Sequence, residues 1–174
     1  MTNEAVDLDF RLEGPDLVES ASRYRKLGPG ELGDGPLTVS WFCYPTWLRV
    51  GNTDVLAVGE TLRNVAILGL AMDLPSALHG LRTDSETECA VFGVNARLVM
   101  RRFDSQVRLR VVESGIEAVA NFDELQLATR RFAHRVATTL REALPEAFRS
   151  DTASRWLDWA LDAERLDLDW RSGT

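Results

Sequence analysis

The sequence predicts a single α+β domain over residues 1–174, with a mainly antiparallel sheet, a buried central helix and a C-terminal helix pair packed on one face. Three observations lead to this fold class. Strand patterns occur in consecutive groups joined by short turns, an apolar helical segment lies between two such groups, and two amphipathic helical segments follow the last strands. A chain of 174 residues with 45% hydrophobic and 27% charged residues also has the size and composition of one folded domain.

The N-terminal part of the chain contains one strand pattern, one helix and one loop. Apolar residues from Val6 to Leu12 alternate with charged residues, which is typical of a half-buried strand. Residues 16–27 are expected to form a short helix. Residues 28–36 contain four glycines and two prolines, and this composition predicts a flexible loop.

Two further strand patterns follow this loop. Residues 37–44 predict a strand, and Pro45 is expected to end it because proline cannot donate to a strand ladder. Residues 46–50 and 54–58 predict a hairpin around a turn that contains glycine and asparagine.

The apolar helical segment comes next. Thr61 is a candidate N-cap for a helix that continues to residue 71 or 72. The segment is apolar nearly all round, so we expect the helix to lie in the core. Pro75 and Gly80 are expected to bound a second, short helical turn.

Residues 89–122 predict three or four strands. A two-residue turn at Asp104 and Ser105 would pair Arg101 with Arg108 and place the flanking apolar residues on the opposite face. The next turn, at residues 113–115, leads into a last strand. Consecutive short turns of this kind predict antiparallel pairing.

The clearest helix begins after Asn121, which is a candidate N-cap with Glu124 three positions later. Its apolar stripe recurs at spacings of three and four residues and consists of Leu125, Ala128, Phe132, Val136, Leu140 and Leu144. Pro145 is expected to end or kink this helix.

A last helix is predicted near the C-terminus, with Asp151 or Thr152 as its cap. Its predicted stripe consists of Trp156, Leu157, Ala160 and Leu161. Residues 165–174 are expected to form a terminal strand or an extended tail.

The distribution of charge limits the classes of partner. A net charge of −7 argues against nucleic acid and against an anionic membrane. Residues 97–149 nevertheless hold 10 basic and 7 acidic residues. On the predicted hairpin, one face carries Arg97, Arg101, Arg108 and Arg110. This basic face could bind an acidic partner or RNA, or be neutralised by the chain's own acidic N- and C-terminal segments.

No set of residues predicts catalysis. The two histidines, His79 and His134, are expected at a helix end and at a solvent-facing position, and neither has a nucleophile beside it in the sequence. Cys43 and Cys89 are expected to be free thiols. No catalytic residue, cofactor or metal site is therefore predicted.

One enzymatic alternative depends on C-terminal carboxylates. Carboxylate oxygens are ligands for hard divalent cations, and the candidates here are Asp158, Asp162, Asp167 and Asp169. A metal-dependent enzyme is thus retained as an alternative function.

Aromatic residues supply the candidate partner-binding positions. Trp159 lies off the predicted helix stripe, so an exposed Trp159 beside Asp158 and Asp162 would form a protein-binding patch. Trp47 and Tyr44 belong to a second aromatic cluster. The complete set of candidate partner-binding residues is Trp159, Asp158, Asp162, Trp47, Tyr44, Arg101, Arg108 and Arg110.

These features favour a non-catalytic, acidic protein-binding module, such as an immunity-type or antitoxin-type inhibitor or an accessory subunit. Its expected partner is a protein, with a basic toxin or enzyme as one example, because opposite charges speed association. A structural homo-oligomer is a further alternative. No secretory signal or membrane span is predicted, since the N-terminus is acidic and the longest apolar run covers only residues 65–72. We therefore expect a cytoplasmic location and no membrane partner.

Overall fold

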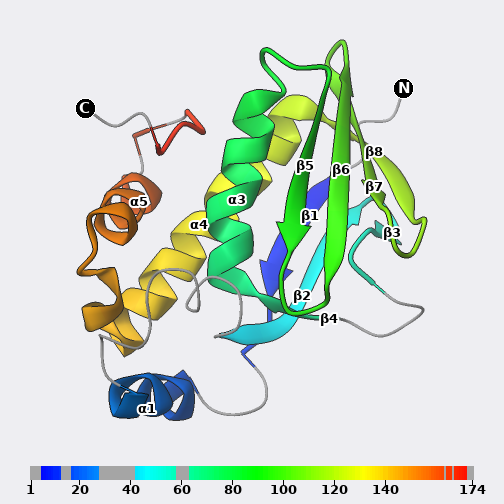
Figure 1. The fold of residues 1–174 in the computed structure, drawn as a ribbon. Helices are drawn as coiled ribbons and strands as arrows, with labels where there is room; N and C mark the ends of the chain where they lie inside the picture. Colours follow the sequence, from blue (N-terminus) through cyan, green and yellow to red (C-terminus); the bar gives the residue numbers. More distant parts are fainter. Residues whose placement is uncertain are drawn as a thin grey trace.

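The structure is a computed structural model, and it describes residues 5–12, 17–27, 42–57, 63–162, 164–165 and 167–171. Helices pack beside two antiparallel sheets (Figure 1), which confirms the predicted α+β class. The prediction of a mainly antiparallel arrangement is correct, but the strands divide into two sheets instead of one. The loop predicted for residues 28–36 lies outside the described residues.

The first sheet is built around a central strand that pairs with three others. Its members are β1 (Val6–Phe10), β2 (Cys43–Val50), β3 (Thr53–Asp54) and β4 (Arg63–Ala66). The predicted hairpin is formed by β2 and the short β3. The prediction that Pro45 ends a strand is wrong, because β2 continues through it. The N–H of Arg11 donates to Pro45 O at 2.8 Å. Strand β1 already ends at Phe10, so the N–H that Pro45 lacks falls at the end of the β1–β2 ladder, and its absence removes little of the strand pairing.

The second sheet is a four-stranded antiparallel meander. Its strands are β5 (Glu86–Val91), β6 (Ala96–Phe103), β7 (Gln106–Val111) and β8 (Glu117–Asn121). The predicted turn at Asp104 and Ser105 is confirmed, and Arg101 pairs with Arg108 in the register. Leu98, Met100 and Leu109 point inward and are fully buried, so one face of the meander belongs to the core.

The central helix α3 (Ile67–Gly80) begins later and runs further than predicted. Residues 63–66 form strand β4, which pairs with β2, so tertiary pairing overrides the helical pattern at this point. Pro75 lies inside α3 and does not end it. The predicted burial is confirmed, since Ile67, Leu70 and Leu74 are at most 1% exposed. Thr61 lies outside the described residues.

Pro75 leaves a carbonyl group of α3 without its helical donor. In an α-helix the N–H of residue 75 would donate to the carbonyl of residue 71, and proline has no N–H. The indole Nε1 of Trp156 donates to Ala71 O at 3.1 Å instead. Trp170 Nε1 donates to the neighbouring Met72 O at 2.8 Å. Two tryptophans from the C-terminal part of the chain thus attach to the buried helix at its proline.

Helix α4 (Phe122–Ala143) matches the sequence prediction closely. Asn121 caps it, and its side chain accepts hydrogen bonds from the backbone N–H groups of Asp123 and Glu124. The whole predicted stripe from Leu125 to Leu144 is buried. The helix ends directly before Leu144 and Pro145, as expected.

The C-terminal part consists of a short 3-10 helix, η1 (Pro145–Phe148), helix α5 (Asp151–Leu161) and an irregular segment. Ser150 caps α5, so the prediction of Asp151 or Thr152 as the cap is off by one or two residues. Residues 167–171 form no strand, but Leu168 and Trp170 are buried. Near the other end of the chain, α1 (Leu17–Leu27) confirms the predicted short helix. None of the helices in the described ranges combines the length and apolar character required to cross a bilayer.

The first testable consequence concerns Trp156. Replacing Trp156 by Phe leaves the buried Ala71 carbonyl without a donor, and we expect this orphaned group to cost about 1–3 kcal/mol of the free energy of unfolding, in addition to lost packing. In a Pro75→Ala background the N–H of residue 75 can satisfy the same carbonyl, so the cost of Trp156→Phe should fall by that amount. Urea denaturation of the four proteins of this double-mutant cycle measures the difference. Equal costs in both backgrounds would contradict the role assigned to this hydrogen bond.

Candidate functional site

The first candidate surface is the outer face of the β5–β8 sheet. Strand alternation turns every second side chain away from the core, and the outward residues of β6 and β7 include the four predicted arginines. The side chains of Arg97, Arg101, Arg108 and Arg110 are all exposed. The predicted arginine face is therefore present.

Half of this arginine face is neutralised within the sheet. Arg97 lies 3.5 Å from Glu113 and 4.0 Å from Glu88, and Arg110 lies 3.5 Å from Glu117. The backbone N–H of Arg97 also donates to Glu113, and this hydrogen bond lowers the pKa of that carboxyl group. The neutralising carboxylates come from β5, β8 and the β7–β8 turn. They do not come from the N- and C-terminal segments that the sequence suggested.

The other half of the arginine face has no such neutralisation. Arg101 and Arg108 stand opposite each other on β6 and β7, and no carboxylate among the described residues lies within ion-pair distance of either. Phe103 and Val119, each 39% exposed, lie on the same face. Arg108 lies over the Phe103 ring, 5.9 Å from its centre. We call these four residues the arginine patch.

Two other candidate residues occupy different environments on β2. Tyr44 is 2% exposed, because the alternation of β2 directs it into the core, so it is not available to a partner in this conformation. Trp47 is half-buried on the opposite face. Its Nε1 donates to Asp7 Oδ2 at 2.7 Å and Arg49 lies over its ring, so it forms part of the first sheet's surface.

The expected exposure of Trp159 is wrong. Trp159 follows Trp156 by three residues and shares its buried side of α5, which leaves it 1% exposed. Its Nε1 donates to Asp167 O at 3.2 Å. Asp158 and Asp162 are exposed as expected, but the Trp159 indole is buried and does not form a surface patch with them.

Arg130 covers the Trp159 ring and also caps the C-terminal end of α5. Its guanidinium lies 4.1 Å from the centre of the Trp159 ring, and it donates to Trp159 O at 3.0 Å and to Asp162 O at 2.7 Å. His134 Nδ1 lies 3.1 Å from Ala160 O. Carbonyl groups at a helix C-terminus lack helical donors, so these two side chains of α4 cap α5. Burial lowers the pKa of Arg130, the positive charge of Arg165 lowers it further, and Asp167 and Asp162 oppose the shift.

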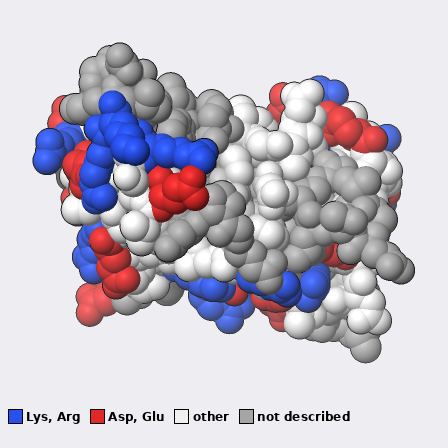
Figure 2. Space-filling view, turned by 90° about the horizontal axis from the view of Figure 1, so that it is seen from below, with Lys and Arg blue, Asp and Glu red and all other residues white. Residues whose placement is uncertain are grey.

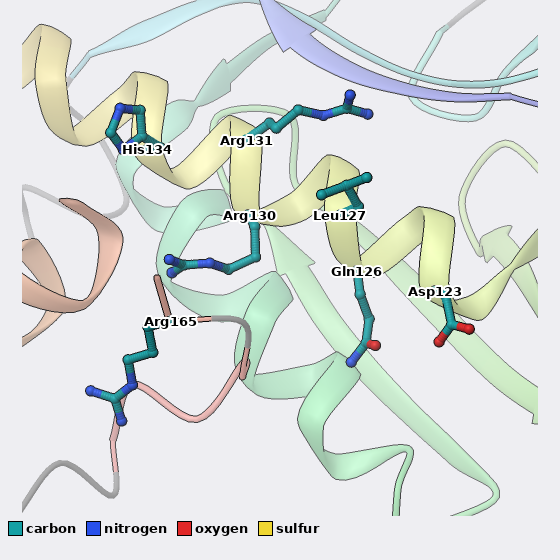
Figure 3. A pocket seen from close by; sticks show the side chains of 7 residues that line it. All are labelled: Asp123, Gln126, Leu127, Arg130, Arg131, His134 and Arg165. Carbon is teal, nitrogen blue, oxygen red and sulfur yellow. The ribbon is translucent and has the colours of Figure 1, made fainter. Parts of the chain in front are cut away.

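A hollow of about 530 Å³ lies between α4 and the segment after α5 (Figure 3). Six of its described lining residues lie on one side of α4, and Arg165 reaches it from the C-terminal segment. The set comprises Asp123, Gln126, Leu127, Arg130, Arg131, His134 and Arg165. Sequence analysis did not single out this hollow, because Arg165 and α4 are brought together only by the packing of α5. The one sequence signal was the concentration of arginines in residues 97–149.

Charge is unevenly distributed over the molecule. In a view from below (Figure 2), the largest group of basic side chains lies at the left, further basic groups follow the lower edge, and acidic groups lie among them, so neither sign covers the face. The described lining of the hollow contains three arginines and one aspartate. A chain with a net charge of −7 thus presents local positive sites.

The described residues do not assemble a metal site, and neither cysteine is suited to act as a thiolate nucleophile. No group of three or more His, Cys, Asp or Glu side chains within them is arranged to hold a metal ion. Asp167 pairs with Arg165, while Asp169 lies 3.7 Å from His79, so the four predicted carboxylates do not converge. Cys43 and Cys89 are free thiols, and burial raises the pKa of both, which disfavours a reactive thiolate.

Comparison of this chain with models of protein families, with curated proteins and with solved structures finds no match in any of the three. The geometry of the described residues distinguishes two surfaces. These are the arginine patch on the outer sheet face and the hollow beside α4.

The capping role of Arg130 can be tested by removing its donors. Arg130→Met keeps an apolar stem over Trp159 but removes the guanidinium from the carbonyl groups of Trp159 and of the C-cap residue Asp162, and we expect the free energy of unfolding to fall by about 2 kcal/mol. Arg131→Met is the matched control, because Arg131 is exposed, and it should change the free energy by less than about 0.5 kcal/mol. Urea denaturation followed by circular dichroism compares them. A similar loss in both variants would argue against the cap.

Proposed function

We propose that this protein is a non-catalytic protein-binding module that contacts an acidic surface of its partner through the arginine patch. An inhibitor or an accessory subunit would act in this way, by occupying a partner without chemistry of its own. The support comes from the patch residues Arg101, Arg108, Phe103 and Val119.

The observation that carries the proposal is the pairing of Arg101 with Arg108. Two like charges directly opposite each other on adjacent strands destabilise a sheet. Glu86 occupies the register position on the other side of Arg101, yet the two form no ion pair. A carboxylate from a partner placed between the two guanidinium groups would relieve the repulsion and make charge-assisted hydrogen bonds.

The composition of the patch also suits a protein partner. Arginine and aromatic residues are enriched at the positions that contribute most to binding energy in protein interfaces. Phe103 and Val119 add exposed apolar surface next to the two cations. Among the described residues of strands β5–β8, Phe103 is the one aromatic side chain on this face, and a single ring does not provide the row of stacking positions that bound bases use, so the composition favours protein over nucleic acid.

The size of the sheet face indicates the strength of the contact. Strands about 4.8 Å apart and six residues long, as β5 and β7 are, give a face roughly 15–20 Å in each direction. Contacts of this size fall at the lower end of specific interfaces, below about 1,200 Å² in total. The face thus suits a reversible association.

The geometry of the patch disfavours two other kinds of partner, a second copy of this chain and a basic protein. A symmetric homodimer through the patch would place arginines against arginines, because a two-fold interface uses the same surface twice. A basic toxin or enzyme as partner stays a prediction from the net charge, whereas the patch favours an acidic partner surface.

Arg108→Glu separates binding from folding. It replaces the like-charged cross-strand pair by an opposite pair, so we expect the free energy of unfolding to rise by a few tenths of a kcal/mol. The same change should abolish capture of a stoichiometric partner from a lysate of the native host at low salt. Thermal denaturation and affinity capture with the full chain measure the two effects.

Arg141→Glu is the matched control, since Arg141 is exposed on α4 and lies outside the patch. It changes the net charge equally and should leave the captured partner unchanged. Charge reversal of the contacting carboxylate in the identified partner should restore binding to Arg108→Glu. A partner that binds both variants as well as the unmodified chain, or no stoichiometric partner, would refute the proposal.

A further inference from the structure

Helix α3 runs alongside β5, an edge strand of the second sheet (Figure 1), and a space of about 330 Å³ lies between them. Its described lining comprises residues 87–90 of β5, Asp73, Ser76 and Ala77 of α3, and Arg171 from the C-terminal segment. Successive side chains of a strand point to opposite faces, so a space bordered by four consecutive residues lies along the edge of the strand itself. We call this space the β5 groove.

The backbone of β5 presents unpaired hydrogen-bonding groups to this groove. The N–H of Arg102 donates to Ser85 O at 3.0 Å, and this bond fixes which alternate residues of β5 pair with β6. The N–H and C=O groups of Glu88 and Ala90 therefore point away from β6, toward the free edge. The described residues supply one contact to these groups, from Cys89 Sγ to Ala90 O at 3.5 Å, and both N–H donors are left without an acceptor.

One end of the same edge already pairs with another segment of the chain. Phe92 follows the alternation of β5, and its C=O accepts a hydrogen bond from the N–H of Ala66 at 2.9 Å. Helix α3 begins at the next residue, Ile67, and its backbone bonds are then made within the helix. The position of an added strand is thus taken up at Phe92 but not beside Glu88 and Ala90.

Carboxylates outnumber cations along the groove. Asp73 and Glu88 line it, and Glu86 lies on the same edge. Arg171 is the one cation in the described part of the lining, and it lies 3.4 Å from Asp73. Glu88 lies 4.0 Å from Arg97, while Glu86 forms no ion pair with any described residue. Opposite charges on adjacent strands stabilise their pairing, so basic side chains are favoured beside Glu86 and Glu88.

The α3 wall of the groove is built from small side chains. Ser76 and Ala77 are half-buried there. Helix and strand touch at Thr87, whose Oγ1 donates to Ala77 O at 2.9 Å and whose Cγ2 lies 3.0 Å from the place that a Cβ would take at Gly80. Beyond this contact the small residues leave room for the apolar side chains of an added strand.

We propose that the β5 groove binds an extended segment of a partner protein in which basic and apolar residues alternate. The segment adds a strand to β5 through the free backbone groups, with its basic side chains beside Glu86 and Glu88 and its apolar side chains toward Ser76 and Ala77. A second copy of this chain fits poorly, because two-fold pairing of β5 with itself would bring these glutamates together. The groove shares no residue with the arginine patch, so its occupancy does not depend on the partner proposed above.

Isothermal titration calorimetry of the full chain with short synthetic peptides at physiological salt tests the proposal. The basic probe is acetyl-Lys-Val-Lys-Val-Lys-Val-Lys-amide, and its acidic counterpart carries glutamate in place of each lysine. We expect a dissociation constant below about 1 mM for the basic probe and at least about 10-fold weaker binding of the acidic probe.

Methylation of the peptide backbone separates strand addition from charge attraction. Two further basic probes carry N-methyl groups on either the lysine or the valine backbone nitrogens, and only one of these two sets faces β5 in an added strand. Methylation of the facing set should lower the affinity at least about 10-fold, whereas methylation of the other set should leave it unchanged. Both probes keep the charge of the unmodified peptide.

Ala90→Pro removes one outward N–H of β5 without touching the β5–β6 ladder, and proline is tolerated on edge strands. The affinity for the basic probe should fall at least about 10-fold, with little change in the melting temperature. Glu88→Gln should lower this affinity about 3-fold. Glu142→Gln, an equal change of charge at an exposed position of α4, is the matched control and should leave the affinity unchanged.

Four results would overturn the proposal. They are the absence of heat from the basic probe at millimolar concentration, equal affinity for the basic and acidic probes, equal affinity for the two N-methylated probes, and unchanged affinity in Ala90→Pro.

Discussion

The architecture depends on how one buried carbonyl group of α3 is satisfied. Pro75 removes the helical donor to Ala71 O in the middle of a helix that is buried on most of its sides, and Trp156 supplies the replacement from 85 residues away in the sequence. Ala71 is fully buried, and a buried carbonyl group needs a hydrogen-bond donor, which here comes from a distant part of the chain. The proline in α3 and the tryptophan in α5 therefore act as one structural unit.

Both candidate surfaces follow from the resulting arrangement. Trp156 and Trp170 attach α5 and the C-terminal segment to α3, and Arg130 then joins the end of α5 to α4. The hollow lies where α4 and this attached segment meet. The β5–β8 sheet lies on the other side of α3 (Figure 1). Its apolar face is buried, which leaves the arginines on the outside.

Sequence patterns were reliable where the deciding interactions are local. The cap at Asn121, the stripe of α4 and the turn at Asp104 and Ser105 each depend on residues only a few positions apart, and all three are confirmed. Errors occurred where distant segments decide the outcome. Residues 63–66 became a strand because β2 was available to pair with them, and Trp159 became buried because Arg130 and Asp167 cover it.

The sequence by itself determined the α+β class, the strand alternation that puts Arg101 and Arg108 on one face, and the amphipathic side of α4. Periodicity is enough for these features, because the side-chain direction of each residue follows from its position in a helix or strand. Only the tertiary structure decided which arginines are neutralised, which tryptophans are exposed and that a hollow forms beside α4. Each of these depends on distances between side chains that are far apart in the sequence, and such distances are set by packing.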